Sequence, residues 1–279
     1  MIYEAKAFAP ANISCIFKIY RHKNPRWMGS YGVGFTINEG VIINLQKSKK
    51  TEIMFNNNSI NFPTVKSVIS KLTNKNLIIH IKSKLPLGCG FGLSGASALA
   101  TAYAINKLLK LKRTNKELAI IAHTAEVENK TGLGDVVNQY YGGFCFKLKP
   151  SSYFIIKKIP ISNANVYCRY FSKISTKSII TNPKLENKIN QSASIALNKI
   201  KNLIKENKNP DLSDIIKISE EFAVNSELLK DRKTIETIKK IEDNNGNASM
   251  IMLGNAVFSD KPFDGAIKLR ISNKSAHLL

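Results

Sequence analysis

The feature that most constrains this chain is a glycine-rich loop, residues 86–98, which reads PLGCGFGLSGASA. An apolar run typical of a strand, Leu77–Ile81, precedes the loop, and a run typical of a helix, Ala96–Leu109, follows it. Glycines leave the backbone N–H groups of such a loop accessible, and the helix adds the positive end of its dipole. Phosphate binds at this kind of site. The pattern therefore predicts a nucleotide phosphate-binding loop whose members are Pro86, Gly88, Gly90, Gly92, Leu93, Ser94, Gly95, Ala96 and Ser97.

Other glycine-rich loops share parts of this pattern. Residues 90–95 satisfy G-x-G-x-x-G, which by itself is a weak signature of dinucleotide binding. A dinucleotide-binding fold would place the motif in its first strand-to-helix turn, whereas residues 1–82 read mostly as strands here. A Walker loop would end in Gly-Lys-Ser or Gly-Lys-Thr, and no lysine stands there. A turn without a ligand is the remaining alternative, against which the hydroxyls of Ser94 and Ser97 argue.

The charge of the chain is strongly positive, with 42 Lys and Arg against 20 Asp and Glu and a formal net charge of +22. Such a charge suits an anionic partner, and RNA binding is one alternative function. The basic residues are mostly lysines spread along the chain, without the arginine forks and aromatic platforms of nucleic-acid readers. We therefore expect a solvated lysine surface and no nucleic-acid partner.

Composition also bears on location and redox state. The 279 residues contain no apolar run long enough to cross a membrane, so no membrane partner is expected. The first residues, MIYEAK, lack the basic and then apolar layout of a signal peptide, which predicts a cytoplasmic protein. The cysteines show no metal-ligand spacing and are expected to be reduced and mostly buried; they are Cys15, Cys89, Cys145 and Cys168.

Strand-like and helix-like segments are segregated along the chain rather than alternating regularly. The first two predicted strands are 2–8 and 13–20, and a glycine-rich turn is expected at 27–34. Segregation of this kind predicts an α+β fold rather than a doubly wound sheet. We divide the chain into two domains, 1–150 and 151–279. The predicted helices are 64–72, 96–109, 116–129, 135–141, 183–206, 212–229 and 233–242.

A possible metal site lies on the predicted helix 116–129. His123 and Glu126 are three residues apart and share a face. Because a carboxylate beside an apolar stripe is costly to bury without a cation, Glu126 is a candidate Mg²⁺ ligand, together with the Ser94 hydroxyl. The alternative is an exposed Glu126 in a surface pair, and Glu128 is the competing carboxylate. His123 is either a hydrogen-bonded structural residue or a donor to a substrate.

A second glycine turn, Thr131-Gly-Leu-Gly-Asp135, ends in an acid at the start of a predicted helix. Asp is a favoured N-cap, and capping would explain this residue in structural terms. If Asp135 lay opposite the phosphate loop, it would instead accept or orient the proton of an attacking hydroxyl. Both roles stay open on the sequence.

Taken in order, these motifs resemble those of the GHMP kinase superfamily of small-molecule kinases. The loop after Pro86 resembles its phosphate motif, and residues 9–12, 132–143 and 248–258 resemble its other motifs. Within the superfamily the chain is most similar to the archaeal pantoate kinases. The segments that carry this similarity are Phe8–Ile13, Gly29–Gly34, Ala122–Glu126, Thr131–Val136, Ile174–Lys177 and Ala248–Phe258.

The resemblance implies an N-terminal domain like the second domain of ribosomal protein S5, a ferredoxin-like C-terminal domain, and an active site between them. It implies ATP and Mg²⁺, and transfer of the γ-phosphate to the primary hydroxyl of pantoate on the route to coenzyme A. Asp135 would be the catalytic acid, while Ser94 and Glu126 would hold metal and phosphate. The residues on the substrate side would be Ser30, His123, Lys147 and Thr176.

The chain also departs from the superfamily pattern. Asn12 stands where mevalonate kinase carries a lysine that helps to activate the hydroxyl. Lys147 stands where the family often has arginine, so a bound carboxylate would meet a point charge rather than a fork. The C-terminal glycine motif is reduced to Gly254. Homoserine, mevalonate and shikimate are alternative substrates, and the resemblance is compatible with a homodimer.

Overall fold

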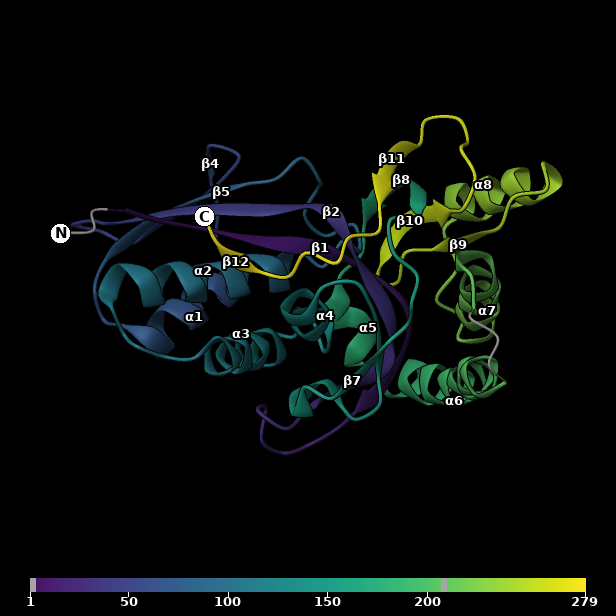
Figure 1. Ribbon diagram of the computed structural model, residues 1–279, viewed down its shortest axis with the longest axis horizontal. Helices are drawn as coiled ribbons and strands as arrows, with labels where there is room; N and C mark the ends of the chain where they lie inside the picture. Colours follow the sequence, from purple (N-terminus) through teal and green to yellow (C-terminus); the bar gives the residue numbers. More distant parts are fainter. Residues whose placement is uncertain (1–3, 207–209) are drawn as a thin grey trace.

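The computed structural model describes residues 4–206 and 210–279. In this part of the chain the strands form an eight-stranded and a four-stranded sheet. Figure 1 shows α1, α2 and α3 along one face of the larger sheet, and α6, α7 and α8 beside the smaller one. The segregation of strands and helices confirms the predicted α+β class.

The strands are β1 (Glu4–Tyr20), β2 (Gly29–Lys47), β3 (Glu52–Phe55), β4 (Asn58–Ser59), β5 (Leu77–Lys82), β6 (Phe144–Lys147), β7 (Ile156–Lys158), β8 (Asn165–Lys173), β9 (Ala248–Met250), β10 (Gly254–Ser259), β11 (Ile267–Arg270) and β12 (His277–Leu278). The helices are α1 (Pro63–Leu72), α2 (Leu93–Leu109), α3 (Asn115–Asn129), α4 (Asp135–Tyr141), α5 (Thr176–Ile180), α6 (Pro183–Lys205), α7 (Leu212–Asn225) and α8 (Arg232–Asp243), with a 3₁₀ turn at Ser151–Tyr153.

β1 and β2 form a long antiparallel pair that corrects two predictions. The segments predicted as separate strands, 2–8 and 13–20, are one strand from Glu4 onward, and residues 2–3 lie outside the described residues. Register shifts between Pro10 and Asn12, and between Ser14 and Ile16, kink this strand without ending it. Most of the glycine-rich segment predicted as a turn, 27–34, is also strand, since β2 begins at Gly29.

The glycines of β2 are needed for close approach of the two strands. A Cβ on Gly34 would lie 2.7 Å from the carbonyl oxygen of Ile13 and 2.8 Å from the Asn138 side chain. Glycine within a strand often marks a bulge or a close backbone approach rather than a turn. The glycines at 29–34 therefore mark a close contact between strands, and the prediction of a turn there is wrong.

The part of the molecule around the eight-stranded sheet is called the larger half here, and the part around the four-stranded sheet the smaller half. α2 is the central helix of the larger half. It begins at Leu93, three residues before the predicted start, and it is buried on nearly all sides. Its alanine-rich sequence accounts for this, because small side chains let β1, β2, α1 and α3 pack around one helix. The N-terminus of α2 is thereby fixed at the end of the glycine loop.

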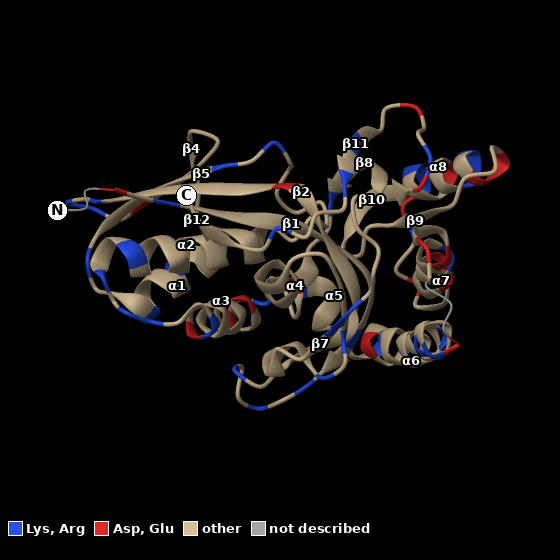
Figure 2. Ribbon diagram, viewed as in Figure 1, with Lys and Arg blue, Asp and Glu red and all other residues tan. Residues whose placement is uncertain are grey.

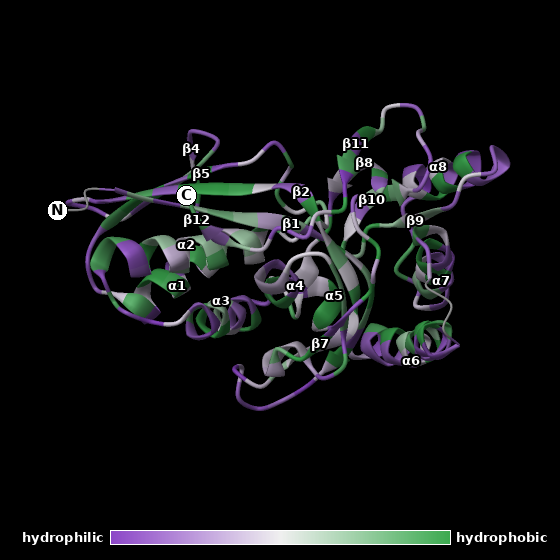
Figure 3. Cartoon of the chain, in the orientation of Figure 1, coloured by the Kyte–Doolittle hydropathy of each residue, from purple (hydrophilic) through white to green (hydrophobic). Residues whose placement is uncertain are grey.

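The helices of the smaller half are amphipathic. Figure 3 shows hydrophilic and hydrophobic residues side by side on α6, α7 and α8. The apolar stripe of α6 contains Ile189, Ala193 and Ile200, which are buried, while its other face is exposed. α6 and α7 also pack against β1, and the main hydrophobic cluster contains residues of both halves.

Two strands that follow residue 150 join the larger sheet. β7 pairs with β6, and β12 returns from near the C-terminus to pair with β1. The boundary between 1–150 and 151–279 stays a prediction.

Among the described residues, no helix is long and apolar enough to cross a membrane. All four cysteines are buried and unpaired.

Candidate active site

The glycine loop places backbone N–H groups at the start of α2. Gly88, Gly90 and Gly92 have φ values of +83°, +88° and +61°, which favour glycine. Gly92 is the residue before the helix, and no side chain caps the first turn. The first N–H groups of this 17-residue helix therefore remain available to an anion.

The smaller half packs directly onto this loop. A Cβ on Gly254 would lie 2.2 Å from the carbonyl oxygen of Cys89, so only glycine fits at this contact. A Cβ on Gly88 would lie 3.1 Å from the side chain of Lys173, and Ile174 donates a backbone hydrogen bond to Gly88. The single glycine left in the C-terminal motif thus supports the shape of the phosphate loop.

A cleft of about 700 Å³, open to solvent, lies beside the loop. It gathers predicted site residues from segments far apart in the sequence, among them Ser30, Gly88, Gly90, Gly92, Leu93, Ser94, Asp135, Lys147 and Thr176. The other predicted residues do not line it: Pro86, Gly95, Ala96, Ser97, His123 and Glu126. The phosphate loop, the acidic residue and the predicted substrate side therefore meet in one place.

Glu126 lies behind the wall of this cleft and is 1% exposed. Its Oε1 accepts a hydrogen bond of 3.3 Å from Thr131, while Oε2 is buried without a hydrogen-bond partner among the described residues. A Cβ on Gly95 would lie 2.8 Å from Oε2, and one on Gly132 would lie 2.5 Å from it. These two glycines make room for the carboxylate, so Gly95 has a packing reason of its own.

Burial raises the pKa of Glu126 to about 8, and the charge of Asp135 acts in the same direction. The hydroxyls of Ser94 and Thr131 act against this shift. The alternative of an exposed Glu126 in a surface pair is therefore wrong. Glu128 is the exposed one, and it pairs with Lys71 at 2.8 Å.

These donors fit a magnesium ion. A buried carboxylate oxygen without a partner is a strong site for a cation, and the Ser94 hydroxyl lies in the same cluster of side chains. Among the described residues, no group of three His, Cys, Asp or Glu side chains would hold a metal by itself. Mg²⁺ is commonly held by one or two carboxylates together with substrate phosphates and water, and Ser94, which lines the cleft, would connect such an ion to Glu126 behind the wall.

Asp135 is the first residue of α4 and is partly exposed. The preceding Gly134 occupies the N-cap position, and no side chain caps the helix, so the N-cap interpretation of Asp135 is wrong. Asp135 Oδ1 instead accepts hydrogen bonds from Asn12, at 2.7 Å, and Ser14, at 3.1 Å. Asn138 in turn donates to Asn12 Oδ1 at 2.8 Å.

Both hydrogen bonds of Asp135 go to Oδ1, and Oδ2 accepts none from the described residues. Burial raises the pKa of Asp135, while Lys147, Asn12 and Ser14 act against this shift. Asn12 therefore orients the carboxylate without adding a charge to it.

Lys147 comes from β6 and is only 2% exposed. Its ammonium lies 2.9 Å from the place that a Gly134 Cβ would take, and Ser30 Oγ lies 2.5 Å from the same place. Burial lowers the pKa of Lys147, and the charge of Asp135 opposes this effect. A buried ammonium at the cleft that forms no ion pair with a carboxylate of the described residues suits an anionic group of a ligand.

His123 is buried beside the cleft rather than in its wall. Its Nε2 lies 2.9 Å from the carbonyl oxygen of Met28, while Nδ1 has no partner among the described residues. Burial lowers its pKa to about 4, so the ring is neutral at pH 7 and Nε2–H donates to Met28. The hydrogen bond from Nε2 to Met28 supports a structural role for His123, and its role toward the substrate stays a prediction.

Several residues at the site carried too little signal in the sequence to be selected. Ser14 holds Asp135, Thr64 accepts from Ser94 at 3.2 Å, and Ile180 lines the cleft beside Thr176. Isolated Ser, Thr and Ile residues are common everywhere, and only Asn12 stood in a recognisable motif. The short helix α5 that carries Thr176 was also missed.

Comparisons with known proteins agree with this geometry. Residues 62–143, which include the glycine loop and Asp135, match the family model of the GHMP kinases N terminal domain. A pantoate kinase of Methanocaldococcus jannaschii is 36% identical over 256 residues, which cover 90% of this chain and 90% of that protein. The chain belongs to the pantoate kinase family of GHMP kinases. A pantoate kinase of Methanospirillum hungatei is 32% identical over 262 residues, which cover 91% of this chain and 86% of that protein.

Solved structures confirm the fold expected of a GHMP kinase. A phosphotransferase related to the CoA biosynthesis pathway superposes with a TM-score of 0.83 at 23% identity, covering 99% of this chain and 98% of that one. Homoserine kinase from Cytophaga hutchinsonii superposes with a TM-score of 0.71 at 19% identity, covering 100% and 98%. The predicted GHMP kinase fold, with its two halves, is the fold of this chain.

Proposed function

We propose that this protein transfers the γ-phosphate of ATP to the primary hydroxyl of (R)-pantoate, giving 4-phosphopantoate and ADP on the route to coenzyme A. The observation that carries the substrate is the 36% identity with a pantoate kinase over 90% of both chains. The cleft supports the chemistry, because it combines a phosphate loop, a carboxylate and a buried ammonium.

The phosphate loop and the N-terminus of α2 would bind the phosphates of ATP through backbone N–H groups. Glu126 and Ser94 would hold Mg²⁺, which neutralises charge on the β- and γ-phosphates when it is bound. Ionisation of Glu126 is disfavoured by burial, so a cation beside Oε2 offsets the cost of keeping this carboxylate charged.

Asp135 would act on the hydroxyl of the substrate. The hydroxyl oxygen forms a bond to the γ-phosphorus, the bond from that phosphorus to the bridging oxygen of ADP breaks, and Asp135 Oδ2 accepts the hydroxyl proton. Asn12 and Ser14 keep Oδ1 occupied and so fix which oxygen faces the reaction. Most of the catalysis comes from positioning and charge, as is usual for phosphoryl transfer.

The substrate carboxylate would pair with Lys147, with Ser30 and Thr176 nearby in the same cleft. The Lys147 ammonium also lowers the pKa of Asp135 and so helps to keep this carboxylate ionised. Figure 2 shows Lys and Arg distributed over both halves of the molecule, a field that attracts anionic substrates. The cytoplasmic location, the homodimer and the role of His123 stay predictions.

The test is the release of ADP from Mg-ATP with pantoate, homoserine, mevalonate and shikimate in parallel. Turnover confined to pantoate supports the proposal. Turnover with another of these alcohols and none with pantoate overturns the substrate but keeps the kinase. If none of the four is turned over, binding to RNA at physiological salt is measured, and tight binding there favours the RNA alternative.

A further inference from the structure

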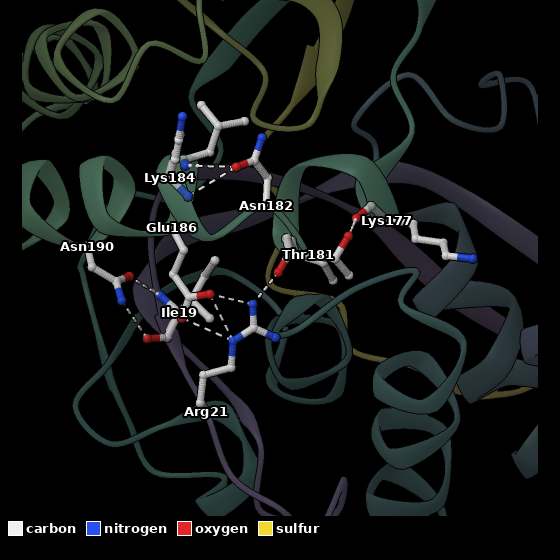
Figure 4. Close-up of polar contacts among 10 residues, drawn as sticks. Ile19, Arg21, Lys177, Thr181, Asn182, Lys184, Glu186 and Asn190 are labelled. Carbon is white, nitrogen blue, oxygen red and sulfur yellow. Dashed lines mark hydrogen bonds and ion pairs between the residues drawn. The ribbon is translucent and has the colours of Figure 1, made fainter.

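The end of β1, α5 and the start of α6 meet at one polar junction. Arg21, directly after β1, donates from Nε to both carboxylate oxygens of Glu186 at 3.0 and 2.9 Å. Its Nη2 donates to Glu186 as well and also to the backbone carbonyl of Ile180, the last residue of α5. Figure 4 shows the guanidinium of Arg21 between Glu186 and the chain near Thr181. We call Arg21, Ile180 and Glu186 the Arg21 junction.

A second contact repeats this attachment one helical turn further along. Asn190 accepts a hydrogen bond of 2.7 Å from the backbone N–H of Ile19 and donates one of 3.2 Å to its carbonyl oxygen. Ile19 and Arg21 are two residues apart on an extended chain, and Glu186 and Asn190 are four apart on a helix, so each pair shares a side. The spacing of both elements fixes the register of β1 against α6.

α5 depends on this attachment more than a longer helix would. It has five residues, of which only Ile180 is buried, and a helix this short is not stable by itself. Ser175 caps its start, and Arg21 holds the carbonyl at its end. A cation at the last carbonyl of a helix also interacts favourably with the helix dipole.

Both ends of α5 bear on the cleft. Thr176 and Ile180 line it, together with residues of β1 that include Ser14, which holds Asp135. β1 therefore carries the support of Asp135 in its middle and the anchor of α5 just beyond its end. The position of Thr176 relative to Asp135 therefore depends on how α5 is attached to β1.

We propose that the Arg21 junction positions α5, and with it Thr176 and Ile180, against the alcohol substrate. Arg21 is in this view a positioning residue for substrate binding rather than a group that contacts the substrate. The choice of pantoate as the reporter ligand rests on the function proposed above. The bidentate fork and the bond to Ile180 distinguish this arginine from an ordinary surface ion pair.

The kinetic test compares Arg21→Gln and Arg21→Lys with Lys188→Gln. Lys188 is the matched control, because it lies on the same helix α6 and pairs with Glu227 without touching α5. Arg21→Gln is expected to raise the KM for pantoate about tenfold, equivalent to about 1.4 kcal/mol, and to leave the KM for ATP within about twofold. Arg21→Lys keeps the charge but not the fork, so it should resemble Arg21→Gln. The control should leave both KM values unchanged.

A general loss of structure would give a different pattern. An equal rise of both KM values with a marked fall in Tm would make Arg21 merely structural and would overturn the proposal. An unchanged KM for pantoate in Arg21→Gln would overturn it as well. Wild-type kinetics in Arg21→Lys would show that charge alone suffices, which removes the fork and the Ile180 contact from the argument.

Amide hydrogen exchange tests the junction without reference to the substrate. The N–H of Thr181 donates to Lys177 O, and the N–H of Asn182 donates to Ile179 O, so both report on α5. Arg21→Gln should speed exchange here, while Lys188→Gln should not. If wild-type protein does not phosphorylate pantoate, the proposed function fails, but hydrogen exchange still tests whether the Arg21 junction holds α5 in place. Unchanged exchange in Arg21→Gln would overturn the proposed role of the junction.

Discussion

The charged residues of the cleft and those of the helices α6–α8 are held in opposite ways. In the cleft region Glu126 is 1% and Lys147 2% exposed, and neither forms an ion pair within 4.0 Å among the described residues. Exposed charges on the helices include ion pairs, such as Lys199 with Glu221 and Arg232 with Glu236. Figure 2 shows these alternating charges on α6, α7 and α8.

The pKa shifts of these cleft residues and of the exposed Arg232–Glu236 pair also differ. Burial raises the pKa of Glu126 and Asp135 and lowers that of Lys147, so each is pushed toward its neutral form. On α8 a hydrogen bond from Arg232 lowers the pKa of Glu236, which favours the charged form. The exposed pair is complete in the free protein, whereas we expect the buried charges at the cleft to gain their partners from the ligand.

The largest effect is expected from Asp135→Asn, which removes the proton acceptor and leaves the volume unchanged. Turnover should fall by about 10²–10⁴-fold, because a positioned acid or base contributes this much. Tm should be retained, since the amide still reaches the neighbours of Asp135. Steady-state rates and thermal melts check this, and retention of more than about a tenth of the activity would remove Asp135 from catalysis.

Glu126→Gln should be next in size. Loss of one preorganised electrostatic group is expected to lower turnover by about 10²-fold and to raise the Mg²⁺ concentration needed for half-maximal rate. Little change in Tm is expected near pH 7, because Glu126, with a pKa of about 8, is mostly neutral there, as glutamine is. Rates measured against Mg²⁺ concentration decide the matter. An unchanged Mg²⁺ dependence would exclude Glu126 as a ligand.

The stability of the metal-free protein should depend on pH through the same residue. The pKa of Glu126 is about 8 in the folded protein, against 4.5 as its ordinary value, so the folded state binds more protons between these limits. This contribution is full below pH 4.5 and is lost as the pH rises through 8. His123 acts in the opposite direction between about 4 and 6.5, because its pKa is lowered on folding.

Above pH 6.5 the contribution of His123 is complete, while Glu126 continues to release its proton up to about pH 8. Tm should therefore fall by a few degrees, about 2–4 °C for each kcal/mol, as the pH rises from 6.5 to 8 without Mg²⁺. Glu126→Gln should flatten this dependence, and saturating Mg-ATP should reduce it. Calorimetry at several pH values makes the comparison; a Tm that rises over this range in wild-type protein would contradict the burial argument.

The smallest effect is expected on the surface. Lys199→Gln breaks the pair with Glu221, whose side chains are 46% and 47% exposed. Tm should change by less than about 2 °C, and the kinetics should not change, because solvent screens such a pair. A shift of many degrees would show that the contrast between cleft and surface is too simple.

How far the sequence reached is clear from particular elements. The glycine loop before α2, the bounds of α4 and the amphipathic helices were predicted from local spacing, because glycine content and apolar periodicity are properties of a few neighbouring residues. The prediction of a turn at 27–34 was wrong, since glycine marks both turns and close strand contacts, and only the approach of β1 distinguishes them. α5 was not predicted, because a helix of five residues gives no periodic signal.

The tertiary structure decided the state of each charge. Asp135 looked like an N-cap as long as only its neighbours in the chain were considered, but its partner Asn12 lies 123 residues away. The burial of Glu126 and Lys147 likewise depends on distant parts of the chain: Gly95 of α2 packs against Glu126, and β2 pairs with the strand that carries Lys147. Local sequence determined where phosphate would bind, because N–H direction and helix dipole are local properties. Ionisation depends on desolvation and on distant partners, so only the folded chain determined which residues are ready for chemistry.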